Sequence, residues 1–501
     1  MSIGGVKQRL FNDIIGLLFG EPAAILADAI TTYGPCPLGL AAQASHFPIE
    51  DAKTVALSLY AHGVLNITDE GKHKYVSVSS LPAYVLSAPS LLIDPIEEQY
   101  KNAAMTETLK IILFHGIIEY HPKADKSKKK KSTAFSPPID LPDGFGDAIE
   151  KLLEIGILVR RVIECESFTT TDYYSLRRRI ENITISKKRS AASNPNLADL
   201  SNLPSSSELS SKSAAPTDSL FSLTINWPGV ASFLRGRSIV QFAQAALGND
   251  YTKLIENIIE VTKCSDYSSY QRSMAKDDDS LRGELLPFQR LEYNQIVQKY
   301  ENNLRDDLFT LLDTISDSQM EFLRGGSDGS FWDITTAHSV RAFQIHHIEM
   351  YLEQTLSPYH RRCFNQLRIL GVADTHQIEV SALLSEKDAR SSMYALCKLG
   401  FAQMQSIPRS STDRMINPKS IFVWRYDEEA AIEAYRLLIG EHARRYLARI
   451  TELHKEYEAN EMAEAGNMTA TKTNEKKEKH LCCFNASYAD AMRVFVLFAE
   501  L

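Results

Sequence analysis

The sequence predicts a mainly helical chain with small β-hairpin wings: about four tandem winged-helix domains, followed by a C-terminal helical hairpin or coiled coil. Two observations predict this fold class. First, an amphipathic helix that ends at glycine and leads directly into a two-stranded hairpin recurs along the 501 residues. Second, the hairpins cease after residue 428, and a long helical stripe of apolar residues follows. A hairpin that covers the open side of a small helical core is the winged-helix arrangement.

The repeated unit is clearest in its fourth copy. Ala389, Met393 and Leu396 recur at i, i+4 and i+7 and therefore share one helical face. Gly400 follows, and glycine tolerates the positive φ that ends many helices. The next stretch, 401–427, reads as two strands around a long polar loop, with Phe422 and Trp424 on one strand face because side chains alternate.

Three earlier segments repeat the pattern. In the first copy a stripe from Ala52 to Leu59 ends at Gly63 and precedes a hairpin over 64–78. In the second, a helix over 149–155 ends at Gly156, with a strand to Val162 and a return strand at 173–176. The third copy is weaker: a helix over 304–315, then strands at 320–323 and 331–334. Four unrelated helix–hairpin connections remain the alternative.

Composition sets the expected domain limits. We expect winged helices at 1–80, at 81–185 with a basic disordered insert at 121–140, at 220–335 with a loop at 264–285, and at 336–428. Residues 186–219 form a Ser-rich linker that we expect to be disordered, because few apolar residues are present to bury. The helical hairpin takes 429–501, with a polar tip at 466–479 and a return leg from Ala486.

Charge and cysteine content exclude several classes of protein. Lys plus Arg number 55 and Asp plus Glu 63, a net charge of −8, which argues against a free-standing tight nucleic-acid binder. The 7 cysteines include no Cys-x-x-Cys pair, so we expect a reducing compartment without a disulfide framework or zinc site. No apolar run approaches the length of a membrane span, and the N-terminus reads as an amphipathic helix rather than a signal peptide.

No catalytic constellation is visible in the sequence. The glycine-rich run Gly325–Gly329 lacks the Gly-Lys-Ser/Thr ending of a phosphate loop and reads as a turn. His346, His347 and His360 do not have the spacing of metal ligands. We therefore expect no enzymatic activity, no cofactor, no metal and no small-molecule ligand.

The helices that would read DNA bases do not suit that role. In the first copy the residues expected to be exposed are Glu50, Asp51, Lys53, Thr54 and Ser58, and the two carboxylates would face phosphates with the wrong sign. Glu386, Lys387, Asp388, Arg390 and Ser391 of the fourth copy are mixed in charge. Neither set is rich in the Arg, Asn and Gln that read bases.

Basic residues gather instead in the fourth wing. Arg409, Arg414, Lys419 and Arg425 are candidate contacts to a DNA backbone; a solvated loop, or one docked on a protein, is the alternative. A separate run, Lys128, Lys129, Lys130 and Lys131, is a candidate nuclear-localisation signal or electrostatic tether, or solvated charge.

The fourth copy resembles the family of third-largest subunits of eukaryotic DNA-directed RNA polymerase III. These subunits are the multi-winged-helix members of a peripheral initiation heterotrimer. Matching residues are Met393, Tyr394, Phe401, Gln405, Ile407, Pro408, Arg409, Asp413, Lys419, Phe422 and Trp424. The sequence departs from the family at Ser406, where an acidic residue is usual, and at Lys419, where arginine is usual. These departures concern local contacts and leave the expected fold unchanged.

The resemblance implies a non-catalytic polymerase subunit in the nucleus. Its expected partners are two companion heterotrimer subunits, the clamp of the largest subunit and an initiation factor, with non-specific DNA contact and no membrane. It would assist promoter opening for synthesis of transfer RNA, 5S RNA and other small RNAs. Two alternatives stay open: a free-standing winged-helix general transcription factor that binds promoter DNA, and a scaffold subunit of another large assembly.

Overall fold

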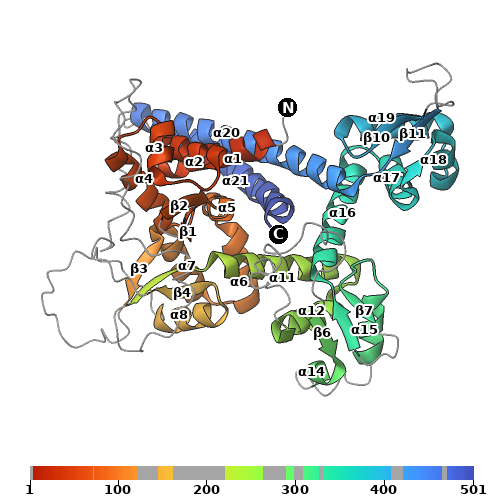
Figure 1. The fold of residues 1–501 in the computed structure, drawn as a ribbon, viewed down its shortest axis with the longest axis horizontal. Coiled ribbons are helices and arrows are strands. Elements are labelled where there is room, and N and C mark those ends of the chain that lie inside the picture. The colour runs from red at the N-terminus through yellow and green to blue at the C-terminus, as the bar shows by residue number, and fades with distance from the viewer. Residues whose placement is uncertain are drawn as a thin grey trace, which may run out of the picture. The chain divides into compact units, whose positions relative to one another are not determined.

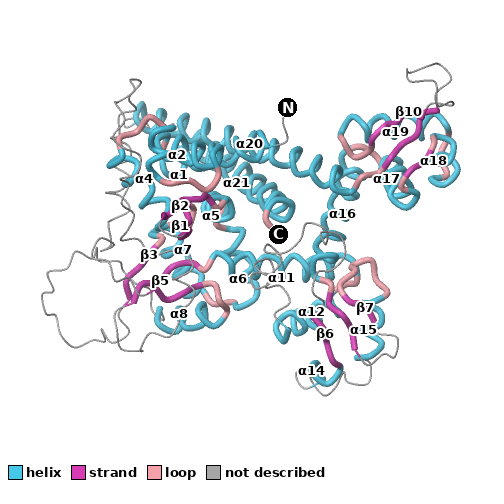
Figure 2. The backbone as a smooth tube through the Cα atoms, viewed as in Figure 1, coloured by secondary structure: helices cyan, strands magenta, loops and turns pink. Residues whose placement is uncertain are grey.

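The structure is a computed structural model that describes residues 4–70, 73–120, 145–161, 221–262, 289–297, 308–325, 331–407, 421–464 and 471–501. Helices dominate these residues, and their strands form four small antiparallel sheets (Figures 1 and 2). The chain divides into two compact units. The first takes residues 1–234, 440–496 and 500, and the second takes 235–439, 497–499 and 501. The mainly helical prediction with small hairpin sheets is confirmed.

The first sheet belongs to unit 1 and follows four helices: α1 (Gly4–Phe19), α2 (Glu21–Tyr33), α3 (Leu38–Ala44) and α4 (Ile49–Ala61). Strands β1 (Leu65–Glu70) and β2 (His73–Val78) pair from Leu65↔Val78 to Glu70↔His73. Gly63 links helix to strand at φ 74°, and a Cβ there would collide with the indole of Trp227. Ser58, expected to be exposed, is instead buried on the inner face of α4.

The second sheet is completed by a strand that the sequence analysis assigned to the next domain. It follows α5 (Ser80–Ser87), α6 (Ser90–Tyr100) and α7 (Ala103–His115), and α8 (Phe145–Glu154) lies between its first two strands in the sequence. Its strand order is β3 (Ile117–Tyr120), β5 (Phe221–Ile225), β4 (Leu158–Arg161), with β5 antiparallel to both neighbours. The third domain was expected to begin at residue 220, but residues 221–225 complete the second sheet and therefore belong with the second domain. The expected return strand 173–176, the insert 121–140 and the linker 186–219 lie outside the described residues.

The third sheet lies in unit 2. Its elements are α11 (Trp227–Ala246), which begins in unit 1, then α12 (Asn249–Thr262), β6 (Gln289–Glu292), α14 (Tyr293–Val297), α15 (Leu308–Ser316), β7 (Leu323–Gly325) and β8 (Phe331–Ile334). The strand order β6-β8-β7 puts β8 in the middle. Trp332 of β8 is almost fully buried and lies against Tyr293 and Phe309. The loop expected at 264–285 lies outside the described residues.

The fourth sheet also lies in unit 2. Helices α16 (Thr336–Thr355), α17 (Pro358–Leu370), α18 (Thr375–Ala382) and α19 (Glu386–Leu399) precede the hairpin of β10 (Gln403–Ile407) and β11 (Ile421–Arg425). The short strand β9 (Val372–Ala373) pairs with the far side of β11, which gives the order β10-β11-β9. The strands of β10 and β11 fall within the stretch 401–427 that the sequence assigned to a hairpin.

Two long helices end the chain: α20 (Glu428–Glu464) and α21 (Thr471–Ala499). Within unit 1 their contacts run in opposite directions, because Gly440 lies against Phe495 and Tyr446 lies near Phe484. Helix α21 starts inside the segment 466–479 that was expected to be a polar tip. Its residues 478–499 are long and apolar enough to cross a membrane by length and composition alone. Phe495 is buried, however, and packs edge-on against Tyr84 of α5.

Candidate docking and nucleic-acid interface

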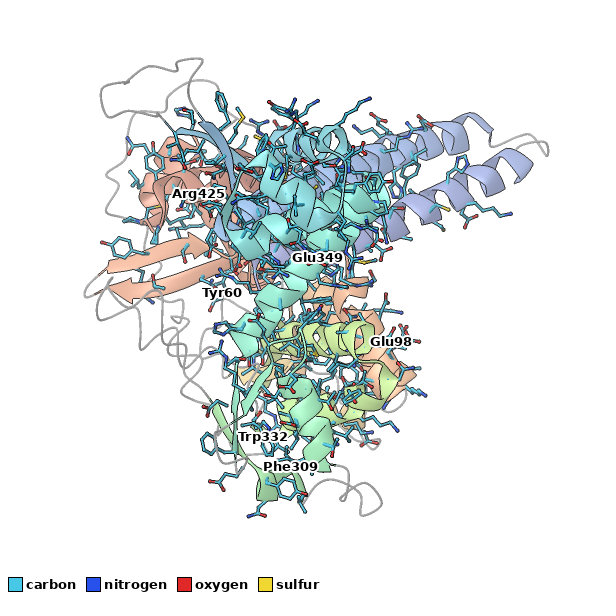
Figure 3. The ribbon with its side chains drawn as sticks, turned by 90° about the vertical axis from the view of Figure 1, so that its right-hand side faces the viewer. Tyr60, Glu98, Phe309, Trp332, Glu349 and Arg425 are labelled. Carbon is cyan, nitrogen blue, oxygen red and sulfur yellow. The ribbon has the colours of Figure 1, made fainter. Side chains whose placement is uncertain are left out.

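Of the predicted DNA contacts, the structure describes Arg425 alone. Arg409, Arg414 and Lys419 fall in 408–420, outside the described residues, as do Lys128, Lys129, Lys130 and Lys131. Arg425 is the last residue of β11, opposite Gln403 on one side and Val372 on the other, and its side chain is exposed (Figure 3). The structure therefore describes one of the four predicted contacts, and their grouping stays a prediction.

Helix α19 occupies the position of a recognition helix in the fourth domain. The local sequence explains where this helix begins and ends. The Ser385 hydroxyl accepts a hydrogen bond from the Asp388 amide at 3.2 Å, which satisfies a free donor at the helix start. Glu386 and Asp388 lie in the first turn, where the helix dipole favours negative charge. Gly400 ends the helix in the left-handed conformation at φ 89°.

The two faces of α19 differ in the way that the spacing predicted. Ala389, Met393 and Leu396 are buried. The outer face carries Lys387, Ser391, Tyr394 and Lys398. Arg390 forms an ion pair with Glu386, one turn earlier, at 2.5 Å. The outer face thus offers two lysines and an aromatic ring but no asparagine or glutamine, so it lacks the side chains that most often read adenine.

An aromatic pair joins this helix to the hairpin. The rings of Tyr394 and Trp424 meet edge to face, with centroids 5.2 Å apart. Trp424 is 3% exposed, and its Nε1 donates a hydrogen bond to the Thr375 hydroxyl at 3.1 Å. Tyr394 is 54% exposed. Trp424 therefore connects β11 to both α18 and α19, while Tyr394 extends the same cluster to the surface.

Exposed apolar side chains concentrate in this part of the chain. Among the described residues 17 large apolar side chains are exposed, and 11 of them lie between Leu356 and Phe422. We call these eleven the apolar surface: Leu356, Tyr359, Ile369, Leu370, Val372, Val380, Leu383, Tyr394, Met404, Ile407 and Phe422. Large exposed apolar patches mark protein-interaction sites, so these eleven residues are candidates for docking.

Leu383 is the most exposed member of the apolar surface and has an unusual backbone. It ends α18 with φ 55° and ψ 52°, the left-handed region, and its side chain is 84% exposed. Such a conformation is uncommon for a bulky residue and is usually taken by glycine or asparagine. Sequence reasoning missed Leu383. The available signal was a leucine at the position where a helix ends and glycine is the ordinary choice.

The buried polar groups nearby support the structure of this domain. Glu349 of α16 is 3.5 Å from Arg361 and 3.7 Å from Arg368, both on α17 (Figure 3 labels Glu349). Burial lowers the pKa of His347 to about 4, and its ring lies 4.5 Å from that of Phe343. Burial raises the pKa of the Cys363 thiol to about 11. A neutral histidine packed on an aromatic ring and a protonated thiol are ordinary interior groups.

The described residues contain no group of three or more His, Cys, Asp or Glu side chains that could hold a metal ion. His346 and His347 adjoin different rings: His346 is 5.6 Å from Phe242, and His347 lies against Phe343. What the geometry of this region offers is contact area: an aromatic cluster, an apolar surface and a few lysine and arginine side chains.

Comparison with known proteins identifies this same region. Residues 348–426 match the family model described as POLR3C, C-terminal winged-helix domain. No curated protein matches the chain. The family match confirms the resemblance to the third-largest subunit of RNA polymerase III and the winged-helix nature of the fourth domain. The match therefore supports a role for this chain as a subunit of that polymerase.

Proposed function

We propose that this chain is a non-catalytic subunit of DNA-directed RNA polymerase III that acts in the nucleus during transcription initiation. In this proposal it forms a heterotrimer with two companion subunits on the clamp of the largest subunit. It contacts an initiation factor and assists promoter opening for transfer RNA, 5S RNA and other small RNAs. The match of residues 348–426 to the POLR3C C-terminal winged-helix domain carries the proposal.

Surface chemistry supports protein docking as the main activity. The apolar surface occupies the domain that matches the polymerase family, so the part with the clearest relationship also has the most unburied apolar side chains. A net charge of −8 disfavours tight binding to DNA by the whole chain. DNA contact is then confined to local basic groups such as Arg425 and the wing residues Arg409, Arg414 and Lys419.

The test is native-mass and identity analysis of what co-purifies with the tagged full chain from nuclear extract at moderate salt. We expect the whole polymerase, with two companion subunits in equal amount. Recovery of the chain alone, or with a proteolytic or translation assembly, would contradict the proposal. Salt-sensitive duplex binding by the isolated chain, without the polymerase, would favour a free-standing transcription factor.

A matched pair of variants tests whether association with the polymerase depends on the apolar surface. Leu383→Asn removes an exposed apolar side chain and places asparagine, which tolerates the left-handed backbone, at φ 55°. Tyr33→Asn removes an exposed apolar side chain from α2, in unit 1. We expect the first variant to reduce recovery of the polymerase and the second to leave it unchanged. Equal recovery with both variants would exclude Leu383 from the interface.

A further inference from the structure

Strand β10 differs from the other edge strands of the described sheets. An edge strand presents unpaired backbone N–H and C=O groups, and proteins usually protect such an edge with charged side chains. The other described edge strands of three or more residues each contain at least one charged or histidine residue: β1, β2, β3, β4, β6 and β7. The sequence of β10 is Gln-Met-Gln-Ser-Ile and contains none.

The burial pattern of β10 matches that of an uncovered edge strand. All five of its residues are exposed, and two of them, Met404 and Ile407, are large and apolar. In the sheet order β10-β11-β9 the described residues place nothing beyond β10. A central or covered strand would bury one face. An uncharged, exposed and partly apolar edge is a template for another strand.

Charge around the edge restricts the partner. The strands β10 and β11 carry no carboxylate, and their single charged residue is Arg425, opposite Gln403. Lys398 lies in the last turn of α19, shortly before β10. A strand arriving here meets positive charge, which favours Asp and Glu in the incoming chain.

We propose that β10 accepts an extended segment of another subunit of the polymerase, which adds a fourth strand to the sheet. The segment has apolar residues at alternate positions, where one face of it packs beside Met404 or Ile407, and has acidic residues at its flanks. Backbone hydrogen bonds supply affinity, and the alternating side chains with the surrounding charge supply selectivity. This inference rests on the proposed function, because the partner is a polymerase subunit.

Site-specific photo-crosslinking in the assembled polymerase tests the strand addition. A photoreactive amino acid replaces Gln403, Gln405 or Ile407 in turn, and these three positions share one strand face. Ser77 on β2, an edge strand that carries His73 and Lys74, is the control position. We expect crosslinks from β10 to one short acidic segment, with crosslinked residues two apart, and none from Ser77 to that segment.

Two substitutions at one position test the charge. Gln405→Glu should lower the crosslinking yield from Gln403 about threefold to fivefold, because an acidic segment is repelled, whereas Gln405→Lys should leave it within about twofold. Hydrogen exchange of the full chain reports whether both variants retain the β10–β11 hairpin. A larger loss with Gln405→Lys than with Gln405→Glu would overturn the acidic partner.

Three other outcomes would overturn the strand addition: crosslinks to DNA, crosslinks to β10 of a second copy of this chain, and a purified polymerase that yields no crosslink. If the tagged chain fails to recover the polymerase, the proposed function fails at the purification step. If the polymerase is recovered and the crosslinks are absent, this inference alone fails.

Discussion

Trp424 shows what a single residue contributes to the fourth domain. It is buried, contacts Tyr394 and donates a hydrogen bond to Thr375. Trp424→Ala should lower the free energy of unfolding of this domain by about 3–5 kcal/mol, since it leaves a large cavity. Trp424→Phe keeps most of the apolar contact but loses the hydrogen bond, a cost of about 1 kcal/mol.

Because the chain has several domains, a single melting curve does not isolate this effect, and hydrogen exchange of the α19 amides is the measurement. Amides of α4, in unit 1, are the internal control. A loss below about 1 kcal/mol for Trp424→Ala would show that the indole does not support the core.

At the same scale, periodicity predicted which side chains share a face, but it did not predict how deeply each side chain on that face is buried. The spacing of Ala389, Met393 and Leu396 predicted the inner face of α19 correctly. The same alternation rule placed Phe422 and Trp424 on one strand face, yet Trp424 is buried and Phe422 is exposed. Alternation fixes the face of a strand, but it does not say how far along the strand the helices cover it.

At the scale of elements, the second sheet shows why local patterns do not reveal every strand of a sheet. Consecutive strands are usually neighbours, so a strand near residue 173 was the natural choice for the return strand. The middle strand of the described sheet is β5, which begins more than fifty residues after β4 ends. Pairing over that separation depends on which apolar residues fill the core, and periodicity within one segment does not contain that information. The remaining domain limits stay predictions.

Leu223 tests this assignment of β5. It is fully buried and clusters with Phe145 and Ile149 of α8. Leu223→Ala should destabilise the second sheet by about 2–5 kcal/mol, because a buried leucine is truncated in a packed core. The expected result is faster hydrogen exchange in α7 and α8, with α15 unchanged. Faster exchange in α15 instead would indicate that residues 221–225 belong to the third domain.

At the scale of the whole molecule, charge distribution decides where DNA contact is compatible with an acidic chain. With a net charge of −8, long-range attraction to DNA is weak, and contact depends on local groups within about one Debye length, roughly 8 Å at physiological salt. The wing sequence between β10 and β11 contains Arg409, Arg414 and Lys419 within thirteen residues, 408–420. The first three helices of the chain offer no comparable cluster. Composition alone revealed this contrast, since charge can be counted without a structure.

The corresponding prediction separates DNA contact from assembly. Arg414→Glu combined with Lys419→Glu should reduce promoter opening by the purified polymerase several-fold and flatten its salt dependence, because two phosphate contacts are replaced by repulsion. Recovery of the polymerase should be unchanged, since the apolar surface is intact. Lys151→Glu with Lys253→Glu changes the net charge by the same amount at exposed positions on α8 and α12, and should leave opening unaffected. Equal effects from both pairs would attribute the result to total charge. No effect from the wing pair would leave docking as the sole activity of the fourth domain.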